Sequence, residues 1–76
     1  MTLEIVKCRL QSIRRAEGIT QIELCQLLDS KFGIKVKQSF ISNLENNRGA
    51  PANHLMLKAL SLIFERDMGD FYVYKW

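Results

Sequence analysis

The chain has 76 residues, of which 47% are hydrophobic and 25% charged, and its formal net charge is +3. This length corresponds to one small domain, and the apolar content excludes an intrinsically disordered chain. So short a chain offers little scaffold for a deep catalytic cleft, and we therefore expect no enzyme. No apolar run approaches the roughly 20 residues of a membrane-spanning helix. The charged N-terminal stretch also lacks the apolar centre of a signal peptide, so we expect a cytoplasmic protein without membrane contact.

The residue types that bind metals do not form a recognisable site in the sequence. Cys8 and Cys25 are the two cysteines, they lie too far apart for a CxxC pair, and there is a single histidine, His54. Such a set does not complete a zinc site. We expect free thiols, no metal and no cofactor, with His54 as a surface or capping residue.

Charge is distributed unevenly along the chain. The middle carries mostly cations, at Lys31, Lys35, Lys37 and Arg48, whereas residues 65–70 are mostly acidic. A basic middle segment favours a polyanionic partner such as nucleic acid.

The first half of the chain predicts two helices. Apolar residues recur at helical spacing over 3–16, and Gly18 provides a C-terminal stop. Residues 20–23, TQIE, match the capping box that begins a helix. This second helix is expected to end near Asp29, and 29–36 is expected to be a loop, since an isolated strand there would have no partner.

The segment 37–46 predicts a short helix with an unusual surface. Phe40, Ile41 and Leu44 have the spacing of a buried face. The remaining side chains are mostly amides and hydroxyls, which donate and accept hydrogen bonds as the edges of DNA bases require.

The second half predicts a turn at 47–51, a helix over 52–64 and a short fifth helix that begins at Asp67. Leu55 and Leu62 share the expected inward face of the long helix. The fold class is therefore all-α: a compact five-helix domain. The aromatic C-terminal segment either covers the core or forms an exposed patch for dimerisation.

Two stretches together resemble a known family. Residues 18–25, GITQIELC, and residues 39–48, SFISNLENNR, followed by Pro51, resemble the phage repressor/Cro class of helix-turn-helix proteins, the Xre family. The resemblance covers about residues 5–72, and the helix-turn-helix would lie at about 20–46 in a single Cro/C1-type domain spanning 1–76. The chain departs from the family in a longer turn before the second of these helices, and Asn47 stands where the family usually has glycine.

The resemblance implies a role for individual residues, although each could also belong to an ordinary solvated face. It implies an internal salt bridge between Arg14 and Glu45. The implied base-contacting residues are Gln38, Ser39 and Asn43. The candidate phosphate contacts, to which we add Lys35 from the long turn, are Gln21, Lys35, Lys37, Asn46 and Arg48.

These observations lead us to expect a sequence-specific double-stranded DNA-binding protein, a repressor-like transcriptional regulator that reads the major groove with helix 37–46. Such proteins usually pair on palindromic operators, so a homodimer is expected. The alternative is a protein-interaction adaptor, of the anti-repressor or antitoxin type, on the same scaffold. The basic residues beside the polar helix favour DNA.

Overall fold

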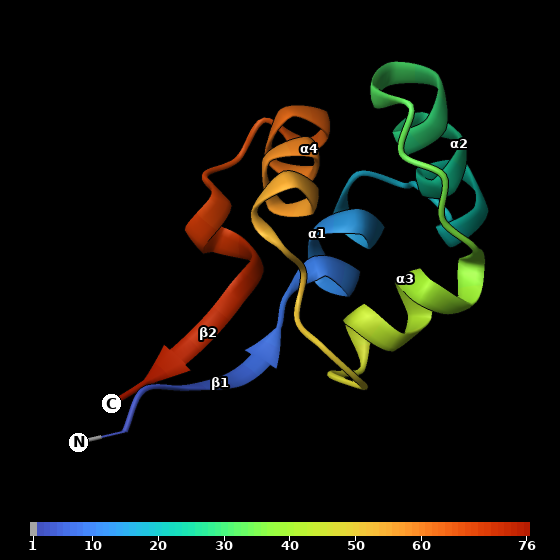
Figure 1. The fold of residues 1–76 in the computed structure, drawn as a ribbon. Helices are drawn as coiled ribbons and strands as arrows, with labels where there is room; N and C mark the ends of the chain where they lie inside the picture. Colours follow the sequence, from blue (N-terminus) through green and yellow to red (C-terminus); the bar gives the residue numbers. More distant parts are fainter. Residues whose placement is uncertain (1) are drawn as a thin grey trace.

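The computed structural model describes residues 2–76 (Figure 1). Within this range the chain forms four α-helices, a short 3₁₀ helix and a two-stranded antiparallel sheet. In chain order the elements are β1 (Glu4–Cys8), α1 (Leu10–Ala16), α2 (Gln21–Phe32), α3 (Gln38–Glu45), α4 (His54–Phe64), η1 (Met68–Phe71) and β2 (Tyr72–Lys75).

The expected all-α, five-helix fold is wrong at both ends of the chain. Residues 4–8 form strand β1 instead of the first half of a helix, and the expected fifth helix is the short η1, followed by strand β2. The β-branched residues of β1 and the aromatic residues of β2 favour strands once they can pair. Because the partner strand lies at the other end of the sequence, local periodicity gives no sign of the pairing.

The two strands form a ribbon that projects from the helical body and carries both chain ends (Figure 1). Cys8 pairs with Tyr72 at the base of the ribbon and Glu4 with Lys75 near its tip. The register shifts between Ile5 and Lys7, which makes Val6 an extra residue in β1.

The helix boundaries follow local signals in the sequence. Thr20 and Glu23 form the predicted capping box at the start of α2, and the Asn53 side chain accepts a hydrogen bond from the backbone of Met56 at the start of α4. Helix α2 continues past the expected end at Asp29 and ends at Gly33, whose φ of 67° favours glycine. The expected loop 29–36 is therefore a helical turn followed by an extended segment.

The core lies between the helices and the base of the ribbon. Its fully buried side chains include one large aromatic, Phe71, and five aliphatic residues: Leu10, Leu24, Leu28, Ile41 and Leu60. Three residues expected inside are exposed, namely Phe40 at 40%, Leu55 at 69% and Leu62 at 52%.

Candidate nucleic-acid interface

Helix α3 is held by one side and exposes the other. Ile41, Leu44 and Glu45 are buried, and they fix the helix against the rest of the domain. The extended segment before α3 is anchored by Ile34 and Val36, which pack against the core. The outward face of α3 therefore sits on a fixed support.

Among the predicted base-contacting residues, Ser39 and Asn43 lie on this outward face, and Gln38 lies at its edge in the first position of α3. Gln38, Ser39 and Asn43 are all exposed. Within residues 2–76, no hydrogen bond engages the side chain of Ser39 or Asn43, so both remain available to a ligand. Gln38 differs from them, because its amide contacts a neighbouring helix.

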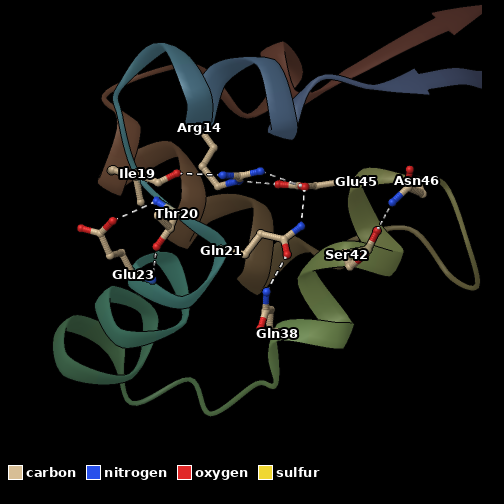
Figure 2. A network of polar contacts seen from close by, with 9 residues as sticks. All are labelled: Arg14, Ile19, Thr20, Gln21, Glu23, Gln38, Ser42, Glu45 and Asn46. Atoms are coloured by element: carbon tan, nitrogen blue, oxygen red, sulfur yellow. Dashed lines mark hydrogen bonds and ion pairs between the residues drawn. The ribbon is translucent and has the colours of Figure 1, made fainter.

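A buried ion pair lies behind α3. Arg14 of α1 and Glu45 of α3, the implied salt-bridge pair, are in contact: Arg14 Nε donates to Glu45 Oε2 at 2.7 Å and Nη2 donates to Oε1 at 3.2 Å (Figure 2). The side-chain exposures are 8% for Arg14 and 0% for Glu45. Arg14 Nη1 also donates to the carbonyl oxygen of Ile19 at 2.8 Å. The pair thus ties α1, α3 and the segment before α2 together.

A chain of two glutamines connects this ion pair to the surface. Gln21 Nε2 donates to Glu45 Oε1 at 2.8 Å, and Gln38 Nε2 donates to Gln21 Oε1 at 3.1 Å (Figure 2). We call the series Arg14–Glu45–Gln21–Gln38 the polar relay. It begins at a buried guanidinium and ends at the exposed amide of Gln38.

The relay fixes which way each amide points. A carboxylate only accepts hydrogen bonds, so Gln21 must turn its NH₂ group toward Glu45, which leaves its oxygen for the NH₂ group of Gln38. Gln38 therefore retains its own oxygen as an acceptor and one N–H as a donor. An adjacent acceptor and donor match the N6 amino group and N7 of adenine.

The predicted phosphate contacts differ in how free their side chains are. Lys35, Lys37 and Arg48 are exposed. The amide of Asn46 donates to the carbonyl oxygen of Ser42 at 2.8 Å. The side chain of Gln21 is engaged at both ends in the relay, so a phosphate could be met there only by its backbone amide, at the positive end of α2.

A shallow hollow lies at the start of α2. It is lined by Arg14, Arg15, Gln21 and Gln38, together with Gln11, Thr20 and Ile22. The lining includes no carboxylate side chain, and Arg15 of α1 is exposed. The hollow is therefore polar, with Arg15 as its exposed cation, since Arg14 is paired with Glu45.

Helix α3 ends at Glu45 with Asn46 as its C-terminal cap, and the next residue, Asn47, has a φ of 55°. Asparagine tolerates this left-handed conformation better than other residues with a side chain, which explains its use where the resembled family has glycine. Arg48 then turns back, and its backbone N–H donates to the carbonyl oxygen of Asn43 at 2.8 Å. The turn places Arg48 beside the C-terminal end of α3.

The C-terminal aromatic residues have two different fates. Phe71 and Tyr72 are buried at 0% and 5% exposure, and the Tyr72 hydroxyl accepts a hydrogen bond from the Ala52 backbone. Tyr74 and Trp76 are exposed, at 40% and 78%. The segment therefore both covers the core and leaves apolar surface at the tip of the ribbon.

The remaining candidate groups do not form a site in the described part of the chain. Cys8 and Cys25 are free, and burial raises the pKa of both thiols. Among residues 2–76 no cluster of histidine, cysteine and acidic side chains could hold a metal ion. No helix in that range has the length and apolar character needed to cross a membrane. His54 is exposed at the first position of α4.

Sequence reasoning missed the contact between Gln21 and Gln38. The two residues are 17 positions apart, on different helices. The available signal was their composition, an amide at the start of each helix and a glutamate on the second.

Comparison of the chain with protein-family models, curated proteins and solved structures finds no match.

Proposed function

We propose that this protein is a sequence-specific double-stranded DNA-binding regulator that reads the major groove with α3. The observation that carries the proposal is the exposed amide of Gln38, held in one orientation by the polar relay. A fixed donor and acceptor pair on an exposed helix has the geometry that base recognition requires, since an α-helix fits the major groove. A solvated helix face would not need its amide held in this way.

Ser39 and Asn43 extend the reading surface. Both side chains are exposed on α3. Asparagine can bond adenine through the same donor and acceptor pattern as glutamine, and a serine hydroxyl can bond either kind of edge. Together with Gln38 they supply three uncharged polar contacts on one helix.

The cations around α3 supply the second requirement, which is attraction to phosphate. Lys35 and Lys37 precede the helix and Arg48 follows it, and all three are exposed. The first backbone amides of α2 add a positive helix end near the same surface. Contacts of this kind would position the protein on the duplex without selecting a sequence.

We further propose that the protein binds as a homodimer on a palindromic operator. The exposed Tyr74 and Trp76 provide apolar surface at the tip of the ribbon. Sedimentation of the parent and of Trp76→Ser tests this, with Leu62→Ser as a control on α4. A weaker dimer for Trp76→Ser alone supports the proposal, and a parent that is monomeric at every concentration overturns it. Truncation after Phe71 is not a suitable test, because it removes the buried Tyr72 and all of β2.

Selection from a random duplex library at physiological salt tests the regulator proposal. We expect an enriched site that contains an adenine, and Gln38→Ala should relax the preference at that base alone. Gln26→Ala, an exposed amide on α2, is the matched control and should leave the preference unchanged. Absence of an enriched sequence would overturn the proposal and favour an adaptor that binds a protein.

A further inference from the structure

The buried carboxylate of Glu45 sits at the origin of the polar relay. Its Oε2 accepts from Arg14 Nε, and its Oε1 accepts both from Arg14 Nη2 and from Gln21 Nε2. Because Arg14 can only donate and the carboxylate can only accept, neither group can reverse its part in the relay. The two glutamines, in contrast, could each turn over by half a rotation at little cost in shape.

We propose that Glu45, through its charge, sets the base preference of Gln38, so that a residue on the buried side of the reading helix selects adenine over guanine. This inference rests on the proposed function. Glu45 would be a positioning residue: its side chain is 0% exposed and so does not touch DNA. Its effect would pass through Gln21 to the amide that meets the base.

The substitution Glu45→Gln makes the argument testable, because it keeps the size and removes one acceptor. The oxygen of the new amide is expected to face Arg14 Nε, because that contact is the shorter one at 2.7 Å and two donors cannot remain that close. The new NH₂ group then takes the place of Oε1, where it faces Gln21 and replaces the longer contact of 3.2 Å from Arg14 Nη2, which loses its acceptor. Gln21 must turn its oxygen toward it and its NH₂ group toward Gln38.

Reversal of the relay changes what Gln38 presents. Its oxygen would now accept from Gln21, and its NH₂ group would offer two donors to the ligand. Adenine requires one acceptor and one donor from the protein, whereas guanine presents two acceptors, N7 and O6. The single buried substitution is therefore expected to move the preference from adenine toward guanine.

The experiment measures binding to the duplex selected by the parent, with adenine or guanine at the base that Gln38→Ala identifies. The parent should prefer adenine by about 5- to 150-fold, the range for one bidentate contact. Glu45→Gln should abolish or reverse this ratio at that base and leave the ratios at other bases unchanged. Glu23→Gln is the control, because it makes the same chemical change in an exposed glutamate outside the relay and retains a residue suited to the capping box.

A second variant keeps the test decisive if Glu45→Gln fails to fold. Gln21→Ala cuts the relay at a half-buried position and leaves the ion pair intact, so it should bring the adenine and guanine affinities close together. The inference is overturned if folded Glu45→Gln keeps the parent's ratio of adenine to guanine affinity. It is also overturned if Gln21→Ala keeps that affinity ratio. A merely structural role would weaken binding equally at every base, which also overturns it. Failure of the proposed function is a different result, namely that no duplex is enriched at all.

Discussion

Replacement of Glu45 by alanine should remove a large fraction of the protein's free energy of unfolding. The carboxylate accepts three hydrogen bonds, two from Arg14 and one from Gln21, and its side chain is 0% exposed. After the substitution Arg14 retains only its bond to the Ile19 carbonyl oxygen, at 2.8 Å. A buried charge without its partner is expensive, and removal of one member of such a pair costs about 3–5 kcal/mol.

That cost is large against the stability of so short a chain. At about 0.05–0.15 kcal/mol per residue, a chain of this length has a free energy of unfolding of about 4–11 kcal/mol. A loss of about 3 kcal/mol corresponds to a fall in Tm of about 12–24 °C. Urea and thermal unfolding of parent and variant, followed by circular dichroism, measure both quantities.

Two further variants separate the ion pair from other effects. Glu23→Ala removes an exposed glutamate of the capping box and should cost about 1 kcal/mol or less. The double variant Arg14→Met, Glu45→Leu removes both charges and should be more stable than Glu45→Ala, since no unpaired charge remains. A loss below about 1 kcal/mol for Glu45→Ala would refute the reasoning, because it would mean that water or another group replaces the carboxylate.

Four other predictions follow from single features of the structure. Glu65→Gly should raise the free energy of unfolding by about 0.5–1 kcal/mol in urea titrations, because Glu65 has a φ of 54°, a conformation that glycine adopts without strain. If Lys31 and Lys35 both contact phosphate, their joint replacement by alanine should reduce the slope of log affinity against log salt by about 1.8, and an unchanged slope would remove both from the interface. Burial raises the pKa of the Cys8 thiol, so the folded state favours the protonated thiol. The thiol's contribution to the free energy of unfolding is full below the ordinary pKa of 9.0 and is lost as pH rises through the raised value. The free energy of unfolding of Cys8→Ala should therefore fall less steeply with alkaline pH than that of the parent. Phe40 is 40% exposed on α3, and contact with a thymine methyl group would make the parent lose about fourfold in affinity when that thymine is replaced by uracil, a loss absent in Phe40→Ala.

The sequence predicted those parts of the fold that depend on neighbouring residues. The helices at 37–46 and 52–64 are confirmed as Gln38–Glu45 and His54–Phe64, and the capping box at Thr20 is confirmed, because periodicity and capping act within a few positions. The strands were missed because β1 and β2 pair across nearly the whole chain, Glu4 with Lys75. Val6 matched a helical period by coincidence, and in the structure it is the extra residue of the β1 bulge.

The same division explains what could be predicted of the candidate site. Exposure of Gln38 could be predicted from local pattern, since Ile41 and Leu44 have the spacing of the buried face and Gln38 stands outside them at the first position of α3. The direction of its amide does not follow from local pattern, because it is decided by Gln21 and by Glu45 behind it. The same glutamine amide can present either its oxygen or its NH₂ group to a ligand, depending on how it is turned. A neighbouring group that can only accept or only donate hydrogen bonds decides between the two orientations. A sequence motif can therefore identify which residue faces the ligand, whereas the hydrogen-bonding pattern it offers depends on contacts between helices.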